Sequence, residues 1–262
     1  MNDLTGTKGG SGVWQRIISE MPAHRVYIEA FWGRGTLAKL KRPAECTIGL
    51  DLDHAAIASG NDFGALMFLA DSRRWLKDYF RLSRSTDAES YVARAAAVAA
   101  GTGAAGSGAA TFAGAAVSEH FVYLDPPYLG CRGYYRHELT EAEHRDLCRV
   151  FLALPCPAAL SGYHSAAYAE ELSGATRLIE IPTVNRAGRK VTECLWLNFD
   201  PPARYHDVRF VGSGRRERER IRRRVRNWRD GLARLPIAER QAVLEGLREE
   251  QLAQPKSPKE IT

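Results

Sequence analysis

The sequence predicts an α/β protein with a mostly parallel sheet and helices on both faces of that sheet. Over the first 200 residues, short apolar runs rich in branched and aromatic side chains alternate with segments of helical periodicity. This alternation is typical of parallel strands joined by helices. A chain of 262 residues has room for one such domain and a smaller appendage.

The individual elements follow from the same patterns. Buried strands are predicted where apolar runs are short and lie between turn residues, at 26–30, 47–51, 66–69, 121–124, 158–161 and 194–199. Helices are predicted between them, at 12–21, 35–41, 54–59, 73–81, 140–153 and 165–172. In sheets of this kind ligands bind at the carboxyl ends of the strands.

Two segments depart from the alternation. Residues 93–117 contain thirteen alanines and five glycines, which predicts a mobile loop within a short insert at 72–120. Beyond a first domain at 1–205, the extension 206–262 is predicted to be helical. Its first helix has one apolar stripe among arginines, and a second helix starts at Pro236 with Leu244 and Leu247 on its inner face.

The positive charge is concentrated in that extension. Ten arginines and three acids between 215 and 234 give a local charge of +7, against a net charge of +6 for the whole chain. Such a segment indicates a polyanionic partner. Alternatively, the helix packs on the domain or forms a dimer seam, so a monomer or a dimer through the C-terminal helices is expected. The candidate phosphate contacts are Arg215, Arg216, Arg222, Arg223 and Arg226.

Several classes of protein are excluded by composition. No apolar stretch reaches 18 residues and no signal pattern opens the chain, so a cytoplasmic protein without a membrane span is expected. The five cysteines form no C-x-x-C pair, which argues against zinc and a disulfide framework. The histidines His24, His54, His144 and His164 show no ligand spacing and are expected at the surface or at helix caps, so no metal is predicted.

The most specific motif is Asp125-Pro-Pro-Tyr128, directly after a predicted buried strand. The Asp125 carboxylate and the carbonyl of Pro126 are two hydrogen-bond acceptors, and Tyr128 offers a flat ring for stacking. Two acceptors and a ring suit an amino group on a planar heterocycle. The alternative is a rigid proline turn with a structural aspartate.

A second set of residues lies at the ends of the first three strands. Gly33 and Gly35 follow Glu29 and allow a ligand to approach the backbone closely. Asp51 ends the second strand, where an acid commonly accepts the ribose hydroxyls of a nucleoside cofactor. Asp71 follows the third strand and is a candidate for the adenine edge. The alternative is that these acids cap the following helices.

In this order, the motifs resemble those of the N6-adenine DNA methyltransferases typified by bacterial DNA adenine methylase, in the alpha-type arrangement of phage and prophage members. The matching segments span residues 5–200: Lys8-Gly-Gly, 27–35, Gly49-Leu-Asp51, Asp125-Pro-Pro-Tyr128 and, more weakly, 134–144, 160–163 and 185–198. Family members often have an aromatic residue four positions before the lysine, where this chain has Leu4.

The resemblance implies a Rossmann-like methyltransferase sheet that binds S-adenosyl-L-methionine and methylates a flipped adenine in DNA. Lys8 would then meet the carboxylate of the cofactor, and Asp51 its ribose. Glu29, Phe31 and Gly33 would line its methionine side, and Asp71 would contact its adenine. Asp125 and the Pro126 carbonyl would hold the target amine, and Tyr128 would stack on the base. Asp125 would also border the cofactor.

Other activities stay open at this point. The same tetrapeptide can serve RNA, and cytosine N4 is also an exocyclic amine. A nucleic-acid-binding phage accessory protein without catalysis is a further alternative, which the intact acids Glu29, Asp51, Asp71 and Asp125 argue against. In the family, the stretch before the tetrapeptide reads the target sequence. Here it is short and rich in alanine and glycine, so weak sequence preference is predicted.

Overall fold

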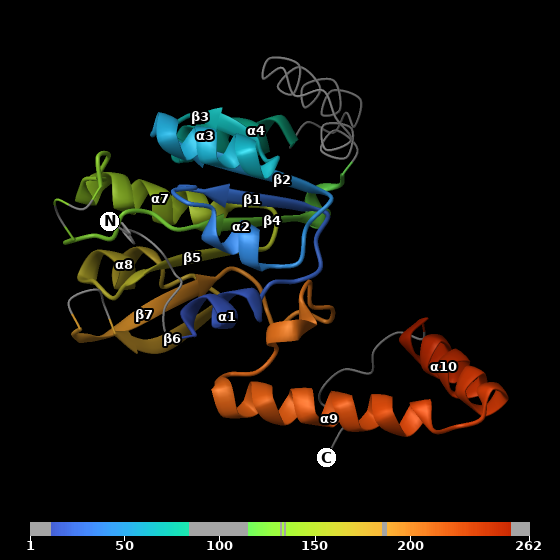
Figure 1. Ribbon diagram of the computed structural model, residues 1–262. Coiled ribbons are helices and arrows are strands. Elements are labelled where there is room, and N and C mark those ends of the chain that lie inside the picture. Colours follow the sequence, from blue (N-terminus) through green and yellow to red (C-terminus); the bar gives the residue numbers. More distant parts are fainter. Residues whose placement is uncertain (1–11, 84–114, 132, 134, 185–187, 253–262) are drawn as a thin grey trace. The chain divides into compact units, whose positions relative to one another are not determined.

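The predicted α/β sheet is confirmed in a computed structural model, which describes residues 12–83, 115–131, 133, 135–184 and 188–252. Seven strands form one sheet in the order β3-β2-β1-β4-β5-β7-β6 (Figure 1). Neighbours from β3 to β5 are parallel, whereas β7 runs antiparallel to both β5 and β6. The strands are β1 (Val26–Ala30), β2 (Cys46–Asp51), β3 (Leu66–Leu69), β4 (His120–Leu124), β5 (Ala158–Tyr163), β6 (Arg177–Val184) and β7 (Lys190–Leu197).

Helices connect the parallel strands, as expected for crossover connections. They begin with conventional caps where polar residues are available: Thr140 and Glu143 form a capping box for α7, and Ser165 caps α8. The helices of this part are α1 (Val13–Ile18), α2 (Thr36–Leu40), α3 (His54–Phe63), α4 (Ser72–Ser83), α7 (Glu141–Ala153) and α8 (Ala166–Glu171), with short 3-10 turns η1 (Val117–Glu119) and η2 (Val208–Phe210).

Strand β6 was not predicted from the sequence. It contains Pro182, which cannot donate a backbone hydrogen bond, and it exposes Leu178 and Val184. Both features fit its place at the edge of the sheet, where a proline is tolerated. The last predicted strand, 194–199, starts earlier than expected and forms β7.

The two faces of the sheet differ in polarity. Alternate strand residues such as Ile28, Val122 and Leu160 belong to an apolar core that also contains residues of α4, α7 and α8. Because successive side chains of a strand point to opposite faces, their neighbours Tyr123 and Ser161 face the other side. Each is completely buried there, so this second face contains polar side chains within the fold.

The chain divides into two compact units, Met1–Val208 and Arg209–Thr262. The second unit contains α9 (Arg215–Ala233) and α10 (Ile237–Leu252), so both predicted helices are present. No side chain of α9 is buried, and Val225 and Trp228 of its apolar stripe are 61% and 71% exposed. Leu244 and Leu247 of α10 are also exposed. Within the described ranges, no helix is both long and apolar enough to span a membrane.

Candidate active site

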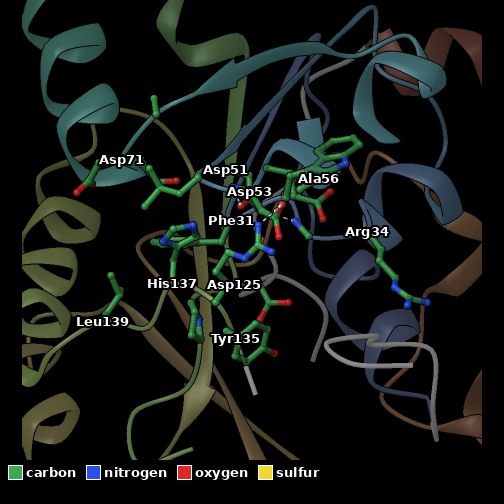
Figure 2. A pocket seen from close by; sticks show the side chains of 18 of the residues that line it. Phe31, Arg34, Asp51, Asp53, Ala56, Asp71, Asp125, Tyr135, His137 and Leu139 are labelled. Carbon is green, nitrogen blue, oxygen red and sulfur yellow. Dashed lines mark hydrogen bonds and ion pairs between the residues drawn. The ribbon is translucent and has the colours of Figure 1, made fainter. Parts of the chain in front are cut away.

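A pocket of about 870 Å³ lies at the carboxyl ends of β1 to β4. Its wall is built from the loops that follow these four strands and from residues of α2, α3 and α7. Figure 2 shows Phe31, Asp51 and Asp125 among the side chains that line it, with Arg34 pointing away. The volume is in the range of sites that enclose a small molecule or cofactor. The pocket is thus at the edge where ligands bind in open α/β sheets.

The loop between β1 and α2 has an unusual backbone. Phe31, Gly33 and Gly35 all have positive φ angles, of 64°, 53° and 61°. A bulky residue such as Phe31 rarely adopts this conformation, and such residues cluster at functional sites. No atom lies within 4 Å of the position that a Cβ on Gly33 would take. Gly33, which lines the pocket, therefore leaves room for a ligand against its backbone.

Asp51 joins two of the pocket loops. The backbone N–H of Gly33 donates to its Oδ2 at 2.7 Å, and the N–H of Asp53 donates to its Oδ1 at 2.9 Å. Each carboxylate oxygen has a second lone pair for a further donor. Asp53, in contrast, caps α3 through the N–H of Ala55. Asp51 is therefore fixed at the pocket wall as an acceptor suited to hydroxyl groups.

Glu29 is a buried acid at the base of the pocket. Only 4% of it is exposed, and its Oε2 accepts hydrogen bonds from the Tyr27 hydroxyl and the Ala38 N–H, both at 3.0 Å. Burial raises the pKa of Glu29 to about 8, although these two donors lower it. In the free protein Glu29 is therefore mostly protonated at neutral pH, and it ties β1 to α2.

Asp71 lies two residues after β3 and has a capping role. Its Oδ1 accepts the backbone N–H of Arg73 at 2.9 Å, at the start of α4. The Arg73 guanidinium contacts its Oδ2 at 2.7 Å and reaches Glu143 of α7 at 2.8 Å. These contacts lower the pKa of Asp71 against the opposing effect of burial. Asp71 lines the pocket, and its contact with the adenine of a cofactor stays a prediction.

The tetrapeptide starts directly after β4. Asp125 lines the pocket and Pro126 is buried. The Ser161 hydroxyl lies 3.0 Å from Oδ1 of Asp125, and the Tyr123 hydroxyl lies 2.7 Å from Ser161 Oγ. The Asp125 carboxylate is thus connected to the interior of the sheet through two hydroxyl groups.

Tyr128 is anchored to β7 and β5. Its hydroxyl donates to Oε1 of the buried Glu193 at 2.7 Å, and its ring meets that of Tyr163 edge to face at 4.7 Å. Glu193 and Tyr163 are direct cross-strand partners. Sequence reasoning assigned no role to Ser161 or Glu193, although both lie in segments of the weaker family matches.

The remaining expectations have mixed outcomes. Lys8 lies outside the described residues. His24 and His144 were expected at the surface or at caps, and this was wrong: both are buried, where His144 contacts the Tyr168 hydroxyl. Cys131, which lies three residues after the tetrapeptide, is a poor nucleophile because burial and the nearby Glu138 raise the pKa of its thiol. The described residues contain no group of three or more side chains suited to a metal ion.

The five candidate phosphate-binding arginines all lie on the exposed helix α9. Arg215 pairs with Glu219 at 2.8 Å, and Arg222 contacts the Arg209 carbonyl at 3.4 Å. Within the part of the chain that the structure describes, no ion pair is found for Arg216, Arg223 or Arg226. Most of the positive charge of this helix is therefore exposed to solvent.

Comparisons with known proteins leave the reaction open. No family model matches the chain, and no curated protein does. The similar solved structures include the 23S rRNA methyltransferase ErmE, with 12% identity, a TM-score of 0.40 and coverage of 75% of this chain and 70% of that one. A magnesium protoporphyrin IX methyltransferase from Synechocystis has 12% identity, a TM-score of 0.39 and coverage of 71% of this chain and 75% of that one. A dimethyladenosine transferase from Plasmodium falciparum has 11% identity, a TM-score of 0.39 and coverage of 72% of this chain and 61% of that one.

Proposed function

We propose that the chain transfers a methyl group from S-adenosyl-L-methionine to N6 of adenine in DNA, with little sequence preference. The observation that supports this best is the position of Asp125-Pro126-Pro127-Tyr128. The tetrapeptide follows the central strand β4, and its aspartate forms part of the wall of the pocket. A donor of methyl groups in the pocket would then adjoin an amine held by Asp125.

The pocket residues fit this cofactor. Asp51 presents acceptor oxygens for ribose hydroxyls, and the open backbone at Gly33 accommodates a chain that passes close to it. Phe31 and Glu29 line the part that would take the methionine moiety, Asp71 the part that would take adenine, and Lys8 would approach the methionine carboxylate. When bound, S-adenosyl-L-methionine supplies an electrophilic methyl group.

The tetrapeptide would prepare the target amine. The N6 lone pair of adenine is delocalised into the ring and is a poor nucleophile. Asp125 and the Pro126 carbonyl would accept hydrogen bonds from its two N–H groups, which favours a tetrahedral nitrogen and frees the lone pair. As the new N–C bond forms, the S–CH3 bond would break, S-adenosylhomocysteine would leave, and one N6 proton would be released to solvent. Stacking on Tyr128 would offset part of the cost of a few kcal/mol of taking the base out of the duplex. Orientation and electrostatics would then contribute most to the rate of methyl transfer, and no covalent enzyme intermediate would form.

The substrate polymer would be held in part by α9. Arg215, Arg216, Arg222, Arg223 and Arg226 give this helix the exposed positive charge that phosphate groups require. Weak sequence preference is proposed because the segment before the tetrapeptide, residues 72–120, has few side chains that can read base edges. A cytoplasmic location accords with access to DNA.

Mass spectrometry of nucleosides tests the proposal. The protein is incubated with S-adenosyl-L-methionine and either methyl-free DNA or methyl-free RNA, and the digested products are identified. N6-methyladenine in DNA that disappears in Asp125→Ala is the expected result. Product in RNA alone would mean that RNA, and not DNA, is the substrate. N4-methylcytosine as the product would mean that the target is cytosine N4 and not adenine N6. A protein that binds nucleic acid but neither binds the cofactor nor forms product would be a binding protein without catalysis.

A further inference from the structure

Asp125 is the last acceptor in a chain of buried hydroxyl groups. Ser161 Oγ lies 3.0 Å from Asp125 Oδ1, and the Tyr123 hydroxyl lies 2.7 Å from Ser161 Oγ. Tyr123 and Ser161 are both completely buried. Neither is among the residues that line the pocket. The Ser161 hydroxyl therefore contacts the candidate catalytic aspartate from inside the protein and not from the ligand side, and the Tyr123 hydroxyl contacts Ser161 there.

The protons in this chain have one consistent arrangement when Asp125 is ionised. A carboxylate only accepts hydrogen bonds, and a serine has one hydroxyl proton to donate. The other acceptors near Ser161 are the Leu124 carbonyl, at the longer distance of 3.5 Å, and the neutral Tyr123 hydroxyl oxygen, which is a weaker acceptor than an ionised carboxylate. Ser161 therefore donates to Asp125, and Tyr123 must donate to Ser161. Burial raises the pKa of Tyr123 well above its usual value, so its hydroxyl keeps the proton that this arrangement needs.

The sheet keeps this chain rigid. Tyr123 lies on β4 and Ser161 on the neighbouring strand β5, where Tyr123 is paired with Ala159. Since side chains two residues apart share a face of a sheet, Ser161 and Ala159 are on the same face. β5 is also bonded to β7 on its other side, so Ser161 sits in the interior of the sheet. A donor on a central strand is better fixed than one on a loop.

We infer that Ser161 is a positioning residue that fixes the orientation of Asp125 toward the target amine, with Tyr123 fixing Ser161 in turn. This inference rests on the proposed function. By donating to Oδ1, Ser161 favours one orientation of the carboxylate. The geometry of an attacking group strongly affects the rate of a methyl transfer that depends on alignment. Ser161 is then needed for turnover and not for cofactor binding.

The experiment compares Ser161→Ala, Tyr123→Phe and the double variant with the wild type. Ser161→Ala should lower kcat by about 10- to 100-fold, because misplacing a positioned group by about 1 Å costs up to about 100-fold in rate. The KM for S-adenosyl-L-methionine should stay unchanged. Ser161→Ala should also lower the urea midpoint, because the buried Tyr123 hydroxyl loses its acceptor. In the double variant both polar partners are replaced, so the urea midpoint should recover while kcat stays low.

Two buried residues outside the site are matched controls. Ser19→Ala removes a hydroxyl that donates to the Arg16 carbonyl at 2.7 Å, and Tyr79→Phe removes one that contacts His120 at 2.7 Å. Both should change the urea midpoint without changing kcat. Wild-type kcat in Ser161→Ala would overturn the inference. So would a double variant whose kcat recovers together with its urea midpoint, because a purely structural hydrogen bond predicts that result.

A second measurement separates this inference from the proposed function. The carboxyl of Asp125 is titrated by carbon NMR in the wild type and in the double variant, without substrate. Loss of a donor to the ionised carboxylate should raise its pKa. An unchanged titration would contradict the positioning role whatever the activity. If the wild type methylates neither DNA nor RNA, the proposed function fails, while the titration still decides whether Ser161 acts on Asp125.

Discussion

The buried Glu29 contributes stability that is lost as the pH rises from 5 to 8. Its pKa is about 8 in the folded chain and 4.5 for an ordinary glutamate. The folded state therefore binds this proton more tightly than the unfolded state does. The stabilisation is complete below pH 4.5 and is lost as the pH rises toward 8. At about 1.4 kcal/mol for each pH unit, the loss is on the order of 3 kcal/mol at pH 7.

The substitution Glu29→Gln isolates this effect. The glutamine carbonyl can accept the hydrogen bonds from Tyr27 and Ala38 that the carboxyl accepts now, and it does not ionise. Lys41, whose pKa burial lowers to about 7, gives the opposite slope above that pH. The Glu29 charge also raises the pKa of Lys41, so the difference between wild type and variant reports Glu29 together with its coupling to Lys41.

Urea unfolding, followed by tryptophan fluorescence at several pH values from 5 to 8, measures the difference. Wild type and Glu29→Gln should have similar stability at pH 5, and the variant should be more stable by about 3 kcal/mol at pH 7. Glu170→Gln, at an exposed glutamate, should follow the wild type. Parallel curves for wild type and Glu29→Gln over this range would refute the assignment of a raised pKa to Glu29.

Three further predictions follow from the site and from α9. Gly35→Ala should lower the urea midpoint and weaken binding of S-adenosylhomocysteine in calorimetry, since its Cβ would collide with the Trp32 ring. Gly64→Ala is the control, because Gly64 also has a positive φ but has open space where a Cβ would lie. Equal losses in the urea midpoint and in binding for the two variants would exclude the collision as the cause. Arg73→Met should destabilise the fold by about 1–2 kcal/mol in urea, because the partly exposed Asp71 and Glu143 lose a charged donor that they share, and an unchanged urea midpoint would contradict this. Replacing Arg216, Arg223 and Arg226 by glutamine should make the slope of log K for DNA binding against log salt concentration shallower by about 0.9 per arginine. Arg25→Gln should leave this slope unchanged. An unchanged slope in the triple variant would mean that these arginines do not contact DNA phosphates.

The parts of the fold that local sequence patterns determine were predictable. The strands from β1 to β5 are apolar runs, and the predicted positions agree with the structure to within a few residues. The strand at 66–69 was predicted to be buried, and this was wrong: β3 lies at the edge of the sheet, where Leu69 is exposed. Phe31, Gly33 and Asp51 were also predictable as pocket residues, because residues at or directly after the carboxyl end of a parallel strand lie at that edge of the sheet. Strand β6 was missed because Pro182 interrupts its pattern, and only its edge position makes that proline acceptable.

The supporting contacts of the site depend on cross-strand register and were not predictable. Glu193 lies opposite Tyr163 only because β7 runs antiparallel between β5 and β6, and no local pattern states that order. His144 was misjudged for a similar reason. It lies on the face of α7 that contacts α8, and its contact with the Tyr168 hydroxyl becomes visible only when the two helices are packed.

The tetrapeptide is held at both ends by the same face of the sheet. Asp125 is bonded to Ser161 of β5, and Tyr128 is bonded to Glu193 of β7. Residues 161, 163 and 193 lie on one face, since Tyr163 is two residues from Ser161 and pairs with Glu193. A two-proline loop with little freedom of its own is thus fixed to adjacent central strands. If the proposed reaction is correct, the acceptor half of the site depends on β5 and β7 as much as the cofactor half depends on the loops after β1 and β2.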